Sequence, residues 1–278
     1  MDHFNNYITV DLDVMQSNYR IMQRLAGVPT MAIIKADAYG HGAVAVTKAL
    51  DADFYGVSSL SEALELRKAQ IQTPILILGH MPTCGYSQAV RNGIRPAIFS
   101  WEDAQALSQT AVEQGVTAPF HFVVDTGMSR IGFQVTEAEA DICRRIAQLP
   151  NLECEGIFSH FATSDEADLS RAQNQAAAFD RFCAMLEDRG VQVQYKHLDN
   201  SAGIIKFDCH YDMVRAGIVL YGLQPSQHVP IRQLGLRPAL CWHSRIAHLK
   251  TLEPGRQVSY GGDFTTSRPT LVATIPVG

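Results

Sequence analysis

Ionisable residues lie at the ends of several apolar segments in this sequence, and their types suggest chemistry on a carbonyl group. Lys35 follows the apolar run Met31–Ile34, His160 ends another apolar run, and Arg215 lies within "MVRAG". A lysine amine that is kept from water can lose its proton and attack a carbonyl carbon. The small-residue turns "SAG" and "AGI" offer backbone N–H groups to an anion such as phosphate. The combination predicts a carbonyl cofactor with a phosphate group, held as a Schiff base.

Each of these residues also has an ordinary structural explanation when it is taken alone. A lysine after a strand commonly extends its ammonium group to solvent. A histidine such as His160 is commonly a half-buried side chain with satisfied hydrogen bonds. Arg215 is less ordinary, because burying a guanidinium group is costly unless a partner meets it. The prediction of a cofactor site therefore depends on the residues occurring together.

Apolar segments with strand composition alternate with segments of helical periodicity between residues 30 and 217. The expected strands are 30–35, 54–59, 74–79, 95–100, 120–125, 154–160, 194–200 and 213–217. Helices are expected over 58–70, 100–115, 136–149 and 169–190, with a capping box at Ser100. This alternation predicts the α/β class and a (β/α)8 barrel, whose active site lies at the carboxyl ends of the strands. A doubly wound open sheet is the alternative, but no GxGxxG pattern follows the first strand.

The sequence changes in character after about residue 233, where strand-like runs and Gly/Pro turns replace the helical pattern. We therefore expect a barrel domain over 11–232 and an all-β domain made of 233–278 with residues 1–10. The segment "NYITVDL" could supply a strand that pairs with this β domain. The chain stops at "LVATIPVG", within an apolar strand pattern. Because domains seldom leave such an edge open, the sequence predicts a β domain that has been cut short.

Composition excludes several classes of function. The 278 residues carry a net charge of −5 with no block of Lys or Arg, so neither nucleic acid nor an anionic membrane surface is an expected partner. No apolar run is long enough for a membrane span, and no signal peptide precedes the first helix. The six cysteines show no CxxC pair, which predicts reduced thiols, no metal site and a cytoplasmic location.

The motif "IIKADAYGHG" resembles the pyridoxal-phosphate lysine motif of bacterial alanine racemases, which combine a barrel with a β domain. Five further segments resemble motifs of this family, in the family's order: "VDTGMSRIGF", "GIFSHFATSDE", "HLDNSAGI", "MVRAGIVLYGL" and "VSYGGDF". The resemblance runs from about residue 7 to the end of the chain. It implies a dimeric isomerase that interconverts L-alanine and D-alanine for peptidoglycan, with pyridoxal 5'-phosphate as cofactor.

The resemblance also implies the residues that carry the reaction. Lys35 would form the Schiff base with the cofactor and act as one base at Cα, and Tyr260 of a second subunit would be the opposite base. Arg215 would face the pyridine nitrogen, with His160 beside it. Arg130 would orient the substrate carboxylate and brace the phenol or cofactor oxygen.

The resemblance also implies which residues would bind the phosphate group of the cofactor. Tyr39, Ser201 and the backbone of Gly217 and Ile218 would hold the phosphate, and Asn200 would lie next to them.

Physical chemistry agrees with two bases, because racemisation removes a proton from one face of Cα and returns one to the other. Free lysine and tyrosine both have a pKa of about 10, so neighbouring cations and the cofactor must lower both values. An arginine, always charged, would not protonate the ring nitrogen, and this disfavours side reactions such as transamination.

Two departures from the family pattern affect the expectations. Val123 stands where the family commonly has a carbamylated lysine that steadies the arginine, so Arg130 would need another counter-charge, for example chloride. The family also continues beyond "IPVG" with further β strands, and they include residues of the substrate pocket and the dimer interface. We therefore expect weak cofactor retention and little turnover from residues 1–278 alone.

Alternative functions remain open from the sequence. A serine or broad-specificity racemase would share the same scaffold, and substrates that differ by one small group are separated by only ~1–3 kcal/mol. A non-catalytic pyridoxal-phosphate-binding barrel is a second alternative, although the motif "VSYGGDF" argues against it. An inactive fragment is the third.

Overall fold

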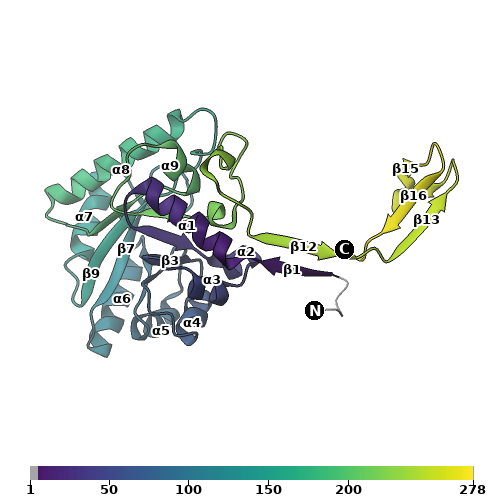
Figure 1. The fold of residues 1–278 in the computed structure, drawn as a ribbon. Helices are drawn as coiled ribbons and strands as arrows, with labels where there is room; N and C mark the ends of the chain where they lie inside the picture. Colours follow the sequence, from purple (N-terminus) through teal and green to yellow (C-terminus); the bar gives the residue numbers. More distant parts are fainter. Residues whose placement is uncertain (1–5, 278) are drawn as a thin grey trace. The chain divides into compact units, whose positions relative to one another are not determined.

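The computed structural model describes residues 6–277, and these form two compact units. One unit comprises Leu12–Ala239, and the other comprises the described residues on either side of it. Figure 1 shows the elements of both units along the chain.

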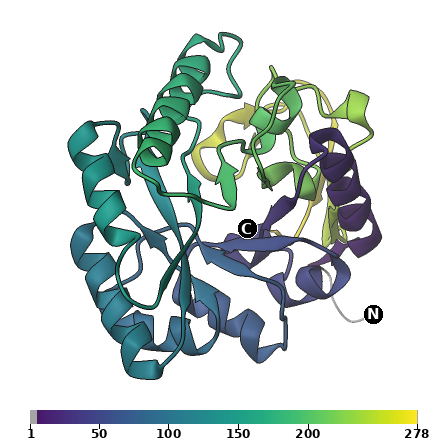
Figure 2. The ribbon, with the colours of Figure 1, turned by 90° about the vertical axis from the view of Figure 1, so that its left-hand side faces the viewer.

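The unit Leu12–Ala239 is a barrel of parallel strands surrounded by helices, as the alternating sequence pattern predicted (Figure 2). Two runs of paired strands make up the barrel, β11-β2-β3-β4-β5 and β10-β9-β7-β6. The strands are β2 Thr30–Ile33, β3 Phe54–Val57, β4 Ile75–Ile77, β5 Ile94–Arg95, β6 Ala97–Ile98, β7 Ala118–Asp125, β9 Leu152–Phe158, β10 Tyr195–His197 and β11 Val214–Ala216. A short strand, β8 Phe133–Gln134, pairs with the end of β7.

The short strands β5 and β6 are two parts of one predicted segment, interrupted at Pro96. β5 pairs with β4, whereas β6 pairs with β7. Proline has no N–H group to donate to a neighbouring strand, which explains the interruption. Counting this segment once gives the eight strands of the predicted barrel.

The helices of this unit are α1 Leu12–Ala26, α2 Lys35–Gly40, α3 Ala43–Ala49, α4 Leu60–Lys68, α5 Tyr86–Arg91, α6 Trp101–Gln114, α7 Glu137–Ile146, α8 Ser170–Asp188 and α9 Ser201–Lys206. Three short 3₁₀ turns accompany them: η1 Thr83–Gly85, η2 Ile218–Tyr221 and η3 Arg232–Leu234. Ser100 caps α6 by accepting a hydrogen bond from the backbone N–H of Asp103, which confirms the predicted cap. Such caps fix where each helix begins, and hence where the preceding loop leaves the barrel mouth.

Apolar side chains fill the barrel interior. Residues from six of its strands, and Met213 beside β11, form one buried cluster: Met31, Ile33, Phe54, Leu76, Ala97, Val123, Phe158 and Met213. Burying side chains of this kind contributes ~1.5–3 kcal/mol each. This packed interior holds the strand ends rigidly, so that residues just beyond them keep fixed positions.

The second unit consists of short antiparallel strands. β1 Asn6–Val10 pairs with β12 Leu240–Ser244, the pairing that the sequence suggested for the first residues. β13 His248–Leu252 pairs with β16 Thr270–Thr274, and β14 Gln257–Val258 pairs with β15 Phe264–Thr265. A 3₁₀ turn, η4 Tyr260–Gly262, lies between β14 and β15.

Candidate active site

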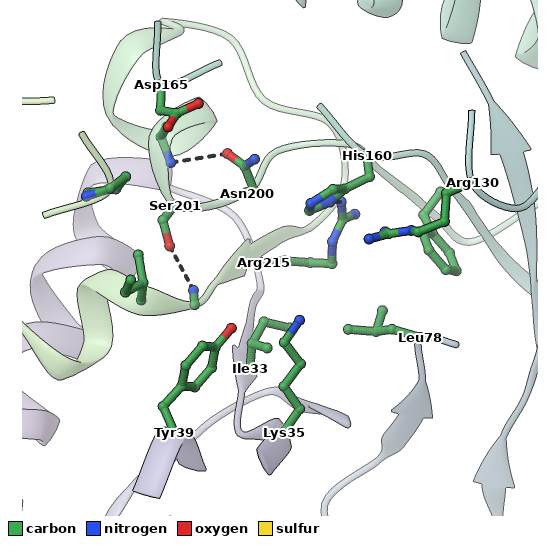
Figure 3. Close-up of a pocket in the computed structure, with 15 residues that line it drawn as sticks. Ile33, Lys35, Tyr39, Leu78, Arg130, His160, Asp165, Asn200, Ser201 and Arg215 are labelled. Carbon is green, nitrogen blue, oxygen red and sulfur yellow. Dashed lines mark hydrogen bonds between the residues drawn. The ribbon is translucent and has the colours of Figure 1, made fainter. Parts of the chain in front are cut away.

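A cavity of about 260 Å³ lies at the mouth of the barrel, where the carboxyl ends of the strands converge (Figure 3). All site residues predicted from the sequence contribute to its wall, except Tyr260: Lys35, Tyr39, Arg130, His160, Asn200, Ser201, Arg215, Gly217 and Ile218. The remaining lining residues are Ile33, Leu78, Phe158, Asp165, Ala202 and Pro225. The barrel thus brings together residues that are up to 192 positions apart in the sequence, from Ile33 to Pro225.

Lys35 and Tyr39 enter the cavity from an unusual turn. Strand β2 ends at Ile33, two residues earlier than the sequence pattern indicated, and residues 36–39 all have φ of 52–53°. This left-handed conformation is rare for residues other than glycine, and it costs roughly 1–2 kcal/mol per residue. Figure 3 shows the Lys35 amine and the Tyr39 hydroxyl both directed into the cavity.

Two carboxylates compensate for the strain of this turn. Glu62 accepts a hydrogen bond from the backbone N–H of Ala36 at 2.8 Å, and Asp37 accepts one from the N–H of Ala43 at 2.6 Å. Burial opposes ionisation of Glu62, but hydrogen bonds from Ser58 and Ala36 outweigh it and lower the pKa of this carboxyl. Glu62 therefore stays charged and holds the beginning of the turn.

The cavity carries more cationic than anionic groups. Lys35, Arg130 and Arg215 line it, and Asp165 is the carboxylate among the lining residues. Burial, together with the charges of Arg215, Arg130 and Lys35, lowers the pKa of His160 to about 3. His160 is therefore neutral near pH 7, and the cavity favours an anionic ligand.

Arg215 is buried beneath the cavity without a hydrogen-bonded carboxylate among the described residues. Its Nη1 donates to His197 Nδ1 and to the His197 carbonyl, both at 2.9 Å. Its Nη2 donates to the carbonyls of Ser159 and Leu198, at 2.7 and 2.9 Å, and lies 3.3 Å from His160 Nδ1. Burial lowers the pKa of Arg215 to about 10, so the guanidinium group keeps its charge near pH 7. These contacts occupy both terminal nitrogens and leave Nε–H as the donor without a partner in the described part of the chain.

Hydroxyl and backbone donors gather on the other side of the cavity. The N–H of Gly217 donates to Ser201 Oγ at 2.9 Å, which leaves the Ser201 hydroxyl hydrogen free to donate. Burial raises the pKa of Tyr39, so its hydroxyl also remains a donor. Asn200 Oδ1 accepts from the N–H groups of Ala202 and Gly203 at 3.1 and 3.0 Å and thereby fixes the start of α9.

Arg130 lies at the exposed side of the cavity. Its pocket neighbour Val123 is buried in the barrel core with 4% of its surface exposed. No ion pair to Arg130 occurs among residues 6–277. The apolar side chain at position 123 therefore supplies no counter-charge to this arginine.

Tyr260 belongs to the other compact unit, in η4, and its side chain is 100% exposed. An exposed phenol on a short turn can be reached by another protein surface. Tyr260 does not line the barrel cavity, in which the phenol belongs to Tyr39.

Sequence reasoning missed several residues at and beneath the cavity. Asp165 lies in the loop after the predicted strand 154–160, and the rule that functional groups lie beyond strand ends could have found it. Leu78 lies within the predicted strand 74–79 and directly after the observed strand β4. His121 and His197 are fully buried within apolar strands. A histidine inside such a run is the signal that could have drawn attention to both.

No helix of the described residues is long and apolar enough to cross a membrane. Two family models match the chain: "Alanine racemase, N-terminal domain" over residues 10–225 and "Alanine racemase, C-terminal domain" over residues 239–278.

Individual relatives agree with the family models. The alanine racemase of Desulfovibrio desulfuricans is 43% identical over 275 residues, which covers 97% of this chain and 74% of the relative. The solved alanine racemase of Clostridium difficile 630 has a TM-score of 0.93 and 37% identity, covering all of this chain and 74% of that protein. A solved alanine racemase from Bartonella henselae, with covalently bound pyridoxal phosphate, has a TM-score of 0.87 and 28% identity, covering 99% of this chain and 76% of that one.

Proposed function

The chain belongs to the alanine racemase family of pyridoxal-phosphate-dependent isomerases, and we propose that its barrel cavity interconverts L-alanine and D-alanine. We further propose Lys35 and Tyr260 as the two bases. The observation that carries the proposal is the position of Lys35 in a cavity whose other donors suit a phosphate and a pyridine ring.

The donor set fits pyridoxal phosphate. Ser201 and Tyr39 each have a hydroxyl that can donate to a phosphate, and the turn at Gly217 and Ile218 borders the same space. A Cβ atom at Gly217 would lie 3.5 Å from Ser201 Oγ and 3.8 Å from the Tyr39 hydroxyl, so any side chain there would fill this space. Arg215 Nε–H is the donor that would meet a ring nitrogen.

Each residue has a distinct task in the proposed reaction. When bound, pyridoxal phosphate supplies an electron-withdrawing ring that makes the hydrogen on substrate Cα acidic. Lys35 holds the cofactor and exchanges a proton at one face of Cα, and Tyr260 from a second copy of the chain exchanges one at the opposite face. Arg215 donates a hydrogen bond to the ring nitrogen but keeps its own proton, which limits delocalisation into the ring. Arg130 orients the carboxylate side of the substrate.

The wider setting is part of the same proposal. The reaction would supply D-alanine for peptidoglycan, in the cytoplasm, and the active form would be a homodimer because Tyr260 lies outside the barrel unit. Sedimentation of the purified chain with cofactor tests the dimer. A monomer that racemises alanine at full rate would exclude a second copy as the source of Tyr260.

The Schiff-base role of Lys35 has a direct test. Pyridoxal phosphate is added to the wild type, Lys35→Ala and Lys68→Ala, and the visible absorbance of the protein-bound cofactor is recorded. We expect Lys35→Ala to lose this absorbance and the formation of D-alanine from L-alanine. Lys68 is exposed at the end of α4, so Lys68→Ala should behave as the wild type. An unchanged spectrum in Lys35→Ala would refute the assignment.

A further inference from the structure

A continuous chain of side-chain hydrogen bonds leads from Arg215 through the interior of the barrel. His197 Nδ1 lies 2.9 Å from Arg215 Nη1, and His197 Nε2 lies 2.8 Å from His121 Nδ1. His121 Nε2 lies 3.0 Å from Glu155 Oε2, and Arg95 donates to both Glu155 oxygens at 2.8 and 2.9 Å. These residues lie on β11, β10, β7, β9 and β5. We call this set the interior chain.

The chemistry of the end groups fixes the direction of every bond in the interior chain. A guanidinium group only donates, so His197 Nδ1 must accept and its proton must be on Nε2. His121 Nδ1 then accepts from His197, which places the His121 proton on Nε2 as well. A carboxylate only accepts, and Glu155 meets that proton. Both imidazoles are therefore neutral and share one tautomer.

Burial supports this protonation pattern. His121 and His197 are fully buried, and desolvation lowers the pKa of both imidazoles. Burial opposes the charge on Glu155, but hydrogen bonds from His121 and Arg95 prevail and lower its pKa to about 2. The carboxylate is thus charged at every pH at which the folded protein is of interest.

We propose that Glu155 and His121 are positioning residues for Arg215, acting through His197. Without the Glu155 acceptor, His121 can carry its proton on Nδ1 and donate to His197. His197 Nδ1 would then carry a proton toward Arg215 Nη1, and two donors would face each other. Arg215 would turn away, and its Nε–H would no longer be aimed at the cavity. The role in catalysis rests on the proposed function, whereas the tautomers do not.

The first test uses Glu155→Met, with Glu153→Met as the matched control, because methionine is close to glutamate in size and lacks the oxygen acceptor. Glu153 lies two residues away on the same strand and is exposed, so both variants remove one carboxylate from β9. Histidine ¹⁵N resonances are recorded with and without pyridoxal phosphate, together with the dissociation constant of the cofactor. Wild type and Glu153→Met should show His197 and His121 protonated at Nε2 only.

Glu155→Met should lose the single Nε2–H form of His197 and bind pyridoxal phosphate roughly tenfold more weakly, the size of one well-aligned hydrogen bond. A wild-type His197 protonated at Nδ1 overturns the proposal. So does a Glu155→Met variant in which either quantity is unchanged. If wild type fails to bind the cofactor, the proposed function fails, but the tautomers of the cofactor-free protein still decide the interior chain.

A second pair of variants applies if Glu155→Met does not fold. In His121→Asn the amide oxygen can replace Nδ1 as the acceptor for His197, whereas His121→Leu has a similar size and no acceptor. We expect His121→Asn to keep the Nε2–H form of His197 and the cofactor affinity, and His121→Leu to lose both. Equal behaviour of the two variants overturns the proposal.

Discussion

Tyr39 and His160 lie in one cavity and are both uncharged near pH 7, but for different reasons. Burial alone raises the pKa of the Tyr39 phenol, whereas burial and three neighbouring cations lower the pKa of the His160 imidazole. The Tyr39 hydroxyl therefore remains a hydrogen-bond donor, and the neutral His160 imidazole adds no positive charge to the cavity. The remaining cations suit a ligand that carries both a phosphate and a carboxylate.

The two-base proposal predicts a specific defect when the Tyr260 hydroxyl is removed. Tyr260→Phe keeps the ring but cannot accept or return a proton, so we expect racemisation to fall by at least ~100-fold. Lys35 should still exchange the Cα hydrogen of one enantiomer with solvent. Solvent deuterium incorporation into L-alanine and D-alanine, measured separately by NMR, distinguishes the two activities.

Tyr7→Phe provides the matched control for this experiment. Tyr7 is a partly exposed tyrosine of the same compact unit, stacked on His243, and it has no proposed role in the reaction. Its variant should racemise alanine at the wild-type rate. The two-base assignment fails if Tyr260→Phe racemises at that rate too.

The left-handed turn after β2 is the structural element that places Lys35 and Tyr39. Ala36 is exposed there at φ 52°, a conformation that a β-branched side chain adopts only with strain. We expect Ala36→Val to lower the free energy of unfolding by about 1–2 kcal/mol and to weaken cofactor binding. Urea denaturation and cofactor titration measure the two effects.

An exposed alanine in an ordinary conformation provides the comparison. Ala167→Val adds the same two methyl groups at a position without positive φ and should change stability by less than ~0.5 kcal/mol. Ala36→Gly relieves the strain and should be tolerated. Equal stabilities of Ala36→Val and Ala167→Val would mean that the turn is not strained.

Local signals in the sequence were sufficient for much of the barrel but not for its details. The Ser100 cap and the eight strand segments follow from patterns within a few residues. The left-handed turn does not, because alanine, aspartate and tyrosine have no preference for φ near 52°, and contacts from distant Glu62 hold it. The contact of His197 with His121 joins residues 76 positions apart, and no local pattern encodes such a pair.

More of the residues that line the cavity could be predicted from the sequence than of the buried residues that support them. Lys35, Arg215 and Ser201 are recognisable because their motifs are short and ordered along the chain. Glu155 and Arg95 look in the sequence like surface charges on strands, since a charged residue in a strand normally faces solvent. Only the closed barrel places Glu155 against the buried His121, and Arg95 against Glu155.

At the scale of the whole molecule, three neutral buried histidines predict instability in mild acid. The pKa of His121, His160 and His197 is lowered in the folded protein, so the unfolded chain takes up protons that the folded barrel excludes. The stability contributed by these histidines is therefore fully present above pH 6.5, the pKa of histidine in the unfolded chain, and it is lost as the pH decreases toward the pKa values of the folded protein. Each histidine contributes about 1.4 kcal/mol per pH unit within this range.

Urea unfolding at a series of pH values measures this dependence. We expect the free energy of unfolding to fall by about 3 kcal/mol per pH unit from His160 and His197 together once the solution is well below pH 6.5, and His121 adds to this slope. Carboxylates such as Glu155, whose pKa is lowered to about 2 in the folded protein, add to the loss of stability only below pH 4.5, the pKa of a glutamate in the unfolded chain. A slope no greater than that of a single histidine would contradict the prediction.

The two runs of paired strands meet at two seams: one lies at Pro96, between β5 and β6, and the other lies between β10 and β11. The Arg95–Glu155 ion pair and the Arg215–His197 bond each join the two strand runs across one of these seams. Side chains thus close the cylinder where few backbone bonds do. We expect that heating loosens these seams and displaces Arg215 before any helix or strand unfolds. On gradual heating, racemisation should therefore decline earlier than circular dichroism changes, and the enzyme's own turnover becomes a gauge of barrel closure.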